Sequence, residues 1–318
     1  MCIVKNDHKK PFINHKPRFF VQKYQPHYQG QRYLGNVQNQ LTTTYQRLSS
    51  GMRINSAKDD AAGLQIADRL TSQINGLNQG NRNASDGIAL AQTIESGMDE
   101  ISGMLQKIRT LAVQASNGTN TAEDRAALAK EASALTAEIA RISRQTTYGG
   151  KSVLEGGTST SIYSKATKAS VGGKMVLQVG SNKGDTISFD VASFKFSVIA
   201  KGNSAGVNKA DPTGTKGQAI EFKDATSAQD LISSMDGIIA KVDAQRANLG
   251  AIQNRLESSI RNQSNVASNE ADARRRIRDA DFAEESANLS QQSIIQQAAA
   301  SMLMQANTRP QLGLSLLG

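Results

Sequence analysis

Three groups of residues in this chain carry side chains that could bind or react. The run Gly149-Gly150-Lys151-Ser152 has the end of a phosphate-binding loop, in which backbone amides and a lysine hold the phosphates of a nucleotide. That motif also needs a glycine five residues before Gly150, where this chain has Gln145. The run therefore predicts a turn after a helix and not a nucleotide site.

The second group contains the only thiol and the only imidazoles of the chain, which are Cys2, His8, His15 and His27. These residue types bind metals, but their spacing matches no zinc pattern, and the prolines among them leave no regular element to hold them. We predict neither a metal nor any other cofactor. A single cysteine also excludes an intrachain disulfide.

Asp59 and Asp60 form the third group, a carboxylate pair of the kind that serves acid and base catalysis. Adjacent residues point to different sides of a helix, and acidic residues are favourable in its first turn, so we interpret the pair as a helix start. The motifs HExxH and GxSxG are absent, and no histidine follows His27. The chain is therefore predicted not to be an enzyme.

Charge and hydropathy predict neither a nucleic-acid nor a membrane partner. The formal net charge is +9, but residues 1–30 contribute six basic residues and one aspartate, which leaves +4 for all the others. The strongest basic cluster lies within a turn or two of acidic residues, which favours pairing inside the protein over binding to phosphates. The cluster is Arg274, Arg275, Arg276 and Arg278, and its acidic neighbours are Asp272, Asp279, Asp281, Glu284 and Glu285. No run approaches the roughly 18 apolar residues that span a bilayer.

Composition and periodicity predict long helices that pack closely through small side chains. Of the 318 residues, 38% are hydrophobic but only 4% are aromatic, and tryptophan is absent. A first helix is expected over about 36–52, and a second one begins after Ser56, its expected cap. The second helix carries an apolar stripe at steps of three and four residues, as in a bundle or coiled coil. The stripe is Ile88, Ala91, Ile94, Met98, Ile101, Leu105, Ile108 and Leu111.

Turn and cap signals place a third helix after the second. The run 117–120 is Asn-Gly-Thr-Asn, which is typical of a turn, and Thr121 with Asp124 comes close to a capping box. The expected buried face of the third helix is Leu128, Leu135, Ile139 and Ile142.

The middle of the chain changes to a strand pattern and then returns to helix. The runs 174–179 and 186–191 predict a β-hairpin, 194–199 predicts a further short strand, and 201–217 is loop-like. Helical periodicity resumes at Ala228, and a last helical segment is expected over about 271–307, ending before Pro310. We therefore predict a mainly α fold, in which the N- and C-terminal segments form a long antiparallel helical bundle or coiled coil, with a small central insert that contains the β-hairpin.

Two long motifs resemble a known family. QRLSSGMRINSAKDDAAGLQIADRL, residues 46–70, is similar to the N-terminal core segment of bacterial flagellin. RRRIRDADFAEESANLSQQSIIQQAAASMLMQAN, residues 274–307, and the closing LGLSLLG resemble the flagellin C-terminal segment. The resemblance covers roughly 31–155 and 225–318.

This resemblance implies a structural function, in which many copies polymerise into the flagellar filament that a rotary motor turns. It implies inner-core helices at 31–60 and 275–318, an outer-core domain at 61–190 and 223–274, and a short variable exposed insert at 191–222. The implied partners are other copies of the chain, an export chaperone on the C-terminal helix, and the filament cap and hook-associated proteins. Secretion through the flagellar type III apparatus to the extracellular filament is also implied. Terminal-helix assembly is expected to use Leu41, Leu48, Ile294, Ile295, Met302, Leu303, Leu314, Leu316 and Leu317.

The resemblance also implies recognition by a host Toll-like receptor. The stretch LQKIRTLAVQ and a later acid match the surface that such receptors bind in many flagellins, and the matching residues are Leu105, Gln106, Lys107, Leu111, Gln114 and Glu131. Lys107 stands where an arginine is usual, and a lysine cannot form a two-pronged hydrogen bond, so recognition is expected to persist but to be weaker.

Residues 1–30 depart from the family pattern. A flagellin usually begins with a short segment that leads straight into the RYL found here at 32–34, whereas this chain has 30 basic, proline-containing residues of no clear period. A frameshift or wrong start explains the boundary most simply, and a specialised variant is the alternative. A second reading of the whole chain is a hook-filament junction protein, an adaptor that shares the terminal helices but does not polymerise.

Overall fold

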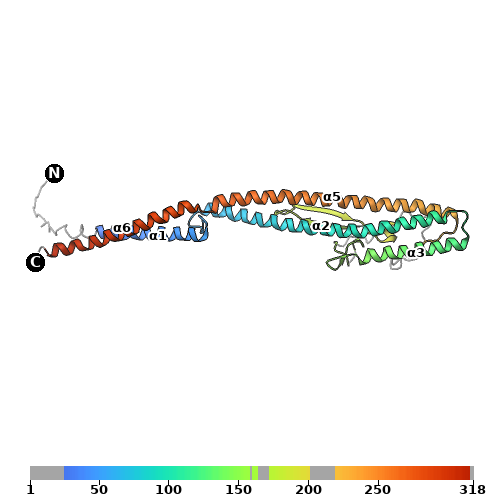
Figure 1. The fold of residues 1–318 in the computed structure, drawn as a ribbon, viewed down its shortest axis with the longest axis horizontal. Helices are drawn as coiled ribbons and strands as arrows, with labels where there is room; N and C mark the ends of the chain where they lie inside the picture. Colours follow the sequence, from blue (N-terminus) through green and yellow to red (C-terminus); the bar gives the residue numbers. More distant parts are fainter. Residues whose placement is uncertain (1–24, 158–159, 164–171, 201–218, 316–318) are drawn as a thin grey trace, which may run out of the picture. The chain divides into compact units, whose positions relative to one another are not determined.

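The computed structural model describes residues 25–157, 160–163, 172–200 and 219–315. Helices α1 (Gln25–Ser50), α2 (Ala61–Ala115) and α3 (Ala122–Gln145) precede strands β1 (Thr147–Tyr148), β2 (Lys151–Ser152), β3 (Gly173–Gln178) and β4 (Thr186–Val191). The short helix α4 (Phe196–Ile199) and the long helices α5 (Ala225–Arg278) and α6 (Phe282–Ser315) follow (Figure 1). The predicted mainly α fold with a β-hairpin insert is confirmed.

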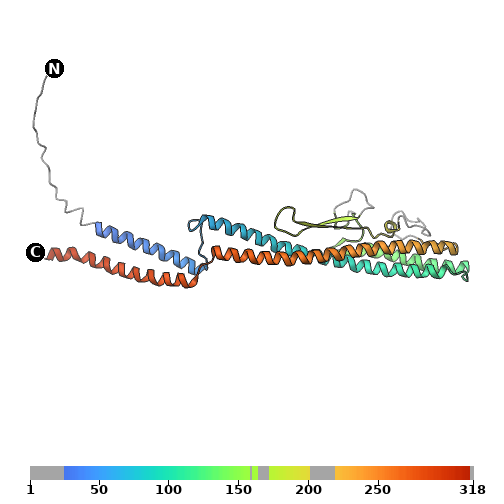
Figure 2. The ribbon, with the colours of Figure 1, turned by 90° about the horizontal axis from the view of Figure 1, so that it is seen from above.

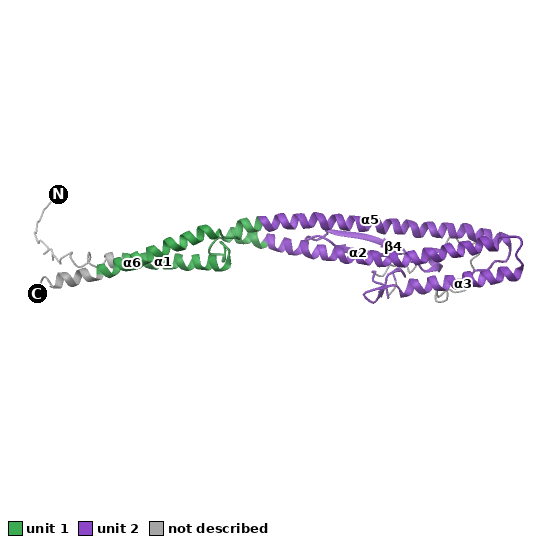
Figure 3. Ribbon diagram, in the orientation of Figure 1, with its two compact units in different colours: residues 1–68, 273–318 green, residues 69–272 purple. Residues whose placement is uncertain are grey.

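The chain divides into two compact units (Figure 3). One unit contains the residues up to Asp68 and those from Ala273 onward, and the other contains Arg69–Asp272. Both divisions fall inside a long helix, α2 or α5, and neither coincides with a loop. The family resemblance implied a different division, between inner and outer core, at 60/61 and 274/275.

In the first unit, α1 and α6 lie side by side and run in opposite directions (Figures 1 and 2). Gly30 near the start of α1 faces Leu303 late in α6, and Arg47 near the end of α1 pairs with Glu285 at the start of α6. The predicted antiparallel pairing of N- and C-terminal helices is therefore present in this unit.

Helix α1 begins earlier than the sequence indicated. We expected irregular structure up to residue 30 and a helix from about 36, but α1 begins at Gln25. Pro26 occupies the first turn, where the missing N–H group would have no partner in the helix, so proline is compatible with a helix start. Cys2, His8 and His15 lie outside the described residues.

The break between the two C-terminal helices lies further along the chain than the sequence indicated, inside the segment expected over about 271–307. The backbone leaves the helix at 279–281, and Asp281 Oδ1 accepts a hydrogen bond from Ala283 N at 2.9 Å, which caps the start of α6. Helix α6 then continues past Pro310 to Ser315, so the expected stop before this proline is wrong. A proline removes one helical hydrogen bond, which here does not end the helix.

Helix α2 also begins later than expected. Its cap is Asp60, whose Oδ1 accepts a hydrogen bond from Gly63 N at 2.8 Å, and not Ser56. Ser56 instead donates its backbone N–H and its hydroxyl to Asp59 Oδ2, at 2.9 and 3.1 Å. The two aspartates thus have the structural role that we predicted for them.

The second unit is built on α2, α3 and α5, and its core contains the predicted stripe. Ile94, Met98, Ile101, Leu105 and Ile108 are fully buried, and Ile88 and Leu111 pack half-buried at the edge. The facing stripe on α5 is buried as well, with Ala228, Leu231, Met235, Ile238, Val242, Leu249, Ile252 and Leu256. Because both stripes follow a helical period, one face of each helix lies in the core.

Polar contacts along the two long helices define an antiparallel register. Asn81 Nδ2 bonds Ser264 Oγ at 3.3 Å, and Gln253 Nε2 bonds Glu95 Oε2 at 3.0 Å. Further along, Asp99 pairs with Arg246 at 3.1 Å, and Arg109 pairs with Asp236 at 2.6 Å. The residue numbers of each pair sum to 345 or 348, so α2 and α5 keep one register over about eight turns of α2.

A capping box holds the turn between α2 and α3. Thr121 Oγ1 accepts from Asp124 N at 3.2 Å, and Asp124 Oδ2 accepts from Thr121 N at 2.9 Å. The near-match in the sequence is therefore a complete box, with aspartate in the place of glutamate. These hydrogen bonds hold the pKa of Asp124 below its usual value.

Replacing Thr121 by alanine is expected to lower the free energy of unfolding by about 1 kcal/mol at neutral pH. The lowered pKa of Asp124 means that its carboxylate stabilises the fold above the unfolded-state pKa, and that this contribution is lost as the pH falls through the folded-state pKa. The difference between wild type and variant should therefore shrink below about pH 4. Urea unfolding at a series of pH values measures it, and a gap that stays constant into acid would contradict the box.

The predicted hairpin is confirmed, and it packs on a row of glycines in α2. Strands β3 and β4 pair antiparallel, and the position of a Cβ on Gly76 would be 2.6 Å from Ser181 Cβ. A Cβ on Gly80 would collide with the Val179 carbonyl, and one on Gly87 with Leu177. Glycine weakens a helix interior by about 1 kcal/mol relative to alanine, but here it lets the hairpin backbone approach the helix.

The other turn and insert predictions have mixed outcomes. Gly149 and Gly150, with φ of 58° and 80°, form the two-residue turn between β1 and β2, so the predicted turn is confirmed. The strand expected at 194–199 is wrong, because Phe196–Ile199 is a short helix. The insert at 191–222 was expected to be exposed, but its described ends are buried in the core. The buried side chains there are Val191, Phe194, Phe196, Ile220 and Phe222. Residues 201–218 lie outside the described residues.

Candidate assembly and recognition surfaces

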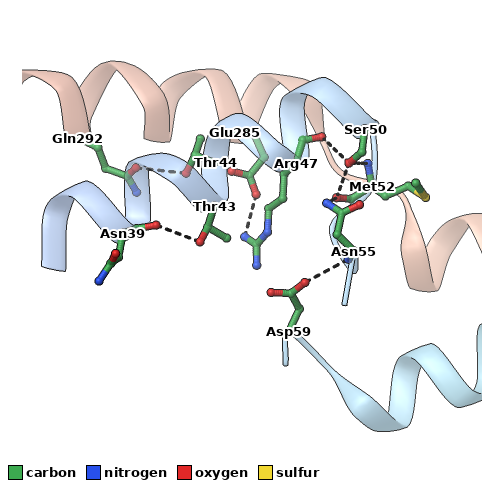
Figure 4. Close-up of polar contacts among 10 residues, drawn as sticks. All are labelled: Asn39, Thr43, Thr44, Arg47, Ser50, Met52, Asn55, Asp59, Glu285 and Gln292. Atoms are coloured by element: carbon green, nitrogen blue, oxygen red, sulfur yellow. Dashed lines mark hydrogen bonds and ion pairs between the residues drawn. The ribbon is translucent and has the colours of Figure 1, made fainter. Parts of the chain in front are cut away.

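Two polar contacts join α1 to α6 (Figure 4). Arg47 Nη1 lies 2.9 Å from Glu285 Oε1, and the Glu285 side chain is only 9% exposed. One helical turn along α1, Thr44 Oγ1 donates to Gln292 Oε1 at 3.1 Å. Each of these contacts forms only when its two side chains lie opposite each other, so together they fix the position of α1 along α6.

Two loops meet at the end of this pair. The C-terminus of α1 ends on Gly51, whose φ of 70° suits glycine and whose N–H donates to Arg47 O at 2.8 Å. Arg53 N donates to Arg278 O at 2.6 Å, and Ala280 N donates to Gly51 O at 3.0 Å. The loop after α1 is thereby joined to the loop before α6.

Asp59 organises the remainder of the first loop. It accepts a hydrogen bond from Asn55 N at 3.1 Å (Figure 4), and it also accepts hydrogen bonds from the Ser56 backbone and hydroxyl groups. These donors hold the pKa of Asp59 below its usual range, the Ser56 backbone N–H having the largest effect. The carboxylate is a structural acceptor and not a catalytic base.

Helix α6 exposes large apolar side chains along its length. Ile294 is 66% exposed, Met302 72% and Met304 66%. Next to them lies a groove of about 640 Å³ between α1 and α6, lined by Tyr33, Ile295, Met302, Leu303 and small residues. Water contact with large apolar side chains is unfavourable, so these exposed side chains and the apolar groove are candidate contact sites for other subunits.

The predicted assembly residues divide by exposure. Ile294 and Met302 are exposed, and Leu41, Leu48, Ile295 and Leu303 are half-buried between α1 and α6. Leu314 lies in α6, but its side chain is outside the described residues, as are Leu316 and Leu317 altogether. Sequence reasoning missed Met304, Tyr33 and Tyr45, which are exposed; the two tyrosines follow the helical period of Val37, Leu41 and Leu48, whereas no periodic signal marks Met304.

The structure changes the predicted receptor surface at one position. Leu105 is fully buried in the core, because it belongs to the apolar stripe that faces α5, so it is not part of an accessible surface. Gln106, Lys107 and Gln114 are exposed on α2, and Leu111 is half-buried. Sequence reasoning missed Val113, which is 47% exposed on the same stretch.

Glu131 comes from α3, the neighbouring helix. Arg125 Nε donates to Ala115 O at 3.1 Å, which ties the first turns of α3 to the end of α2. Because α3 runs back along α2 from this point (Figure 1), Glu131 and the residues 106–114 lie on neighbouring helices of one unit.

Metal and membrane features were also sought among the described residues. Within these ranges no three His, Cys, Asp or Glu side chains are grouped so that they could hold a metal ion. Of the described helices, none is both long and apolar enough to cross a bilayer.

Comparison with known proteins identifies the family. Residues 21–159 match the bacterial flagellin N-terminal helical region, and residues 232–317 match the C-terminal helical region. The chain belongs to the bacterial flagellin family. It is a structural subunit that polymerises into the flagellar filament, used for motility, and the flagellins are a family of structural proteins. The match begins ten residues before the start that the motifs indicated.

Whole-length relatives agree with the family match. The chain is 34% identical to polar flagellin C of Vibrio parahaemolyticus, over 90% of this chain and 96% of the relative. It is 39% identical to a flagellin of Halalkalibacterium halodurans, over 90% of this chain and 95% of the relative. A solved structure from Vibrio parahaemolyticus, assigned as a flagellar hook-associated protein, aligns with a TM-score of 0.51 at 16% identity, over 69% of this chain and 99% of that one, which supports the fold alone.

Proposed function

We propose that this flagellin enters the filament through its terminal helices, with 31–60 and 275–318 forming the inner core. In this arrangement 61–190 and 223–274 form the outer core. The exposed apolar side chains of α6 are the observation that carries the proposal. A helix of one subunit that exposes apolar side chains gains stability when neighbouring subunits cover it.

Burial gives the scale of this effect. Fully burying one large apolar side chain contributes about 1.5–3 kcal/mol, and every subunit in a helical polymer repeats the same contact. A charge at the same position would have to be buried without a partner, which costs far more than the apolar contact contributes. Assembly should therefore be very sensitive to the character of the exposed face of α6.

The experiment compares two double variants of the full chain. Ile294→Glu with Met302→Glu is expected to abolish filaments, seen by negative-stain electron microscopy after addition of a kosmotropic salt, which strengthens apolar burial. Gln291→Glu with Gln297→Glu adds the same charge at exposed polar positions of α6 and should still polymerise. Filaments of normal length from the first variant would refute the proposal.

The same assay separates flagellin from the adaptor reading. A junction protein would remain short or monomeric under conditions in which a flagellin forms long filaments. Long filaments of the unmodified chain would also show that residues 1–24 do not block the inner core.

We further propose the export and assembly partners that the family implies. An export chaperone would cover the apolar face of α6 before secretion through the type III apparatus, since the same side chains are exposed in the single chain. The filament cap and hook-associated proteins would meet the same terminal helices at the two ends of the extracellular filament.

Recognition by a host Toll-like receptor is proposed for Gln106, Lys107, Leu111 and Gln114 of α2 and Glu131 of α3, which are at least partly accessible. Leu105 is left out because it is buried. Lys107→Arg should strengthen receptor signalling, since a guanidinium can form two parallel hydrogen bonds where an ammonium cannot. Unchanged signalling would show that this position does not limit recognition.

A further inference from the structure

The turn between α2 and α3 contains one of two Asn-Gly pairs in the chain, Asn117-Gly118. The other pair, Asn75-Gly76, lies inside α2. An Asn-Gly pair can modify itself when the glycine nitrogen reaches the asparagine side chain, because glycine places no side chain in the way. Whether it does so depends on the freedom of that peptide, and the two pairs differ in this respect.

At Asn117-Gly118 the glycine nitrogen is accessible. Both residues are exposed, and a Cβ on Gly118 would meet nothing within 4 Å. Among the described groups, none accepts a hydrogen bond from Gly118 N. The Asn117 side chain turns toward the backbone that follows it, since its Oδ1 accepts a hydrogen bond from Thr119 N at 3.5 Å.

At Asn75-Gly76 the peptide is held. Gly76 lies well inside the 55-residue helix α2, where its N–H is used by the helical hydrogen-bond pattern. The hairpin covers it, because a Cβ there would be 2.6 Å from Ser181 Cβ. The glycine nitrogen at this position is neither free nor able to rotate toward the asparagine side chain.

We propose that Asn117 is a site of spontaneous deamidation in this protein and that Asn75 is protected. The Gly118 nitrogen loses its proton to solvent base and bonds to the Asn117 side-chain carbon, while the bond from that carbon to Nδ2 breaks and ammonia leaves. The resulting five-membered succinimide then adds water and opens at either carbonyl. The product at position 117 is aspartate or isoaspartate, and no oxidant or reductant is needed.

The modification would disturb the turn that joins α2 to α3. The Asn117 carbonyl accepts hydrogen bonds from Asn120 N at 3.3 Å and from Arg125 Nη2 at 3.4 Å. Isoaspartate inserts a methylene into the backbone and shifts this carbonyl. A new carboxylate would also stand just after the C-terminus of α2, where the helix dipole disfavours negative charge.

The test follows the two sites in the purified full chain at mildly alkaline pH over several days. Peptide mass spectrometry reports the mass gain of about 1 Da, and an isoaspartate methyltransferase labels the rearranged product. We expect Asn117 to react at least about tenfold faster than Asn75 in the folded chain, because only Gly118 has an exposed N–H group outside a helix. In urea the two sites should react at similar rates.

A pair of glycine variants tests the mechanism. Gly118→Ala should slow the reaction at Asn117 by about tenfold, since a methyl group stiffens and shields the attacking peptide. Gly103→Ala, whose Cβ also meets open space but lies inside α2, should leave the rate unchanged. Equal rates at both sites in the folded chain, reaction at Asn117 only in urea, or full reactivity of Gly118→Ala would each overturn the proposal.

Discussion

Replacing Gly80 by alanine is expected to destabilise the second unit by about 1–3 kcal/mol, although alanine is the better helix former. The new Cβ would collide with the backbone carbonyl of Val179, and a backbone atom inside a hairpin cannot move aside as the end of a long side chain can. The β3–β4 hairpin must then lift away from α2. Urea unfolding measures the loss, and faster hydrogen exchange in both strands would locate it.

Gly103→Ala provides the matched control for this prediction. Gly103 lies in the same helix, and a Cβ there meets nothing within 4 Å. Here only helix propensity acts, so stability should rise by about 0.5–1 kcal/mol. If both variants shift stability in the same direction, close packing against the hairpin is not what distinguishes Gly80.

Replacing Arg47 by methionine is expected to cost the first unit about 3–5 kcal/mol. The change leaves the carboxylate of Glu285 without its cationic partner in a position where the side chain is 9% exposed. A buried charge without a partner loses its hydration and gains nothing in return. Hydrogen exchange along α1 and α6 measures the opening of this pair, and filament assembly should weaken with it.

Two further variants separate burial from charge pairing. Adding Glu285→Leu to the Arg47→Met chain removes the orphaned charge and should recover most of the loss. Arg141→Met breaks the pair with Glu138, in which both side chains are about half exposed, and should cost much less than Arg47→Met because solvent screens an exposed pair. A loss at Arg47 no larger than that at Arg141 would mean that the α1 and α6 interface does not depend on this contact.

Much of the fold was readable from local signals in the sequence. The stripes of α2 and α5 follow a helical period, and the hairpin follows a strand pattern between turns, so each element could be predicted from its own residues. Family membership was also readable, because two long motifs occur in the flagellin order. The start of α1 and the end of α6 could not be predicted from the sequence, because whether a helix accommodates Pro26 or Pro310 depends on the position of the proline in the helix.

The sequence by itself determined that this chain consists of long amphipathic helices that need one another, because apolar periodicity is a property of each segment alone. Only the tertiary structure decided which glycines of α2 pack against the hairpin and which face open space. Gly80 is of the first kind and Gly103 of the second. It also decided that Arg47 meets Glu285. These outcomes depend on contacts between residues far apart in the chain, and a periodic pattern says which face is buried but not what covers it.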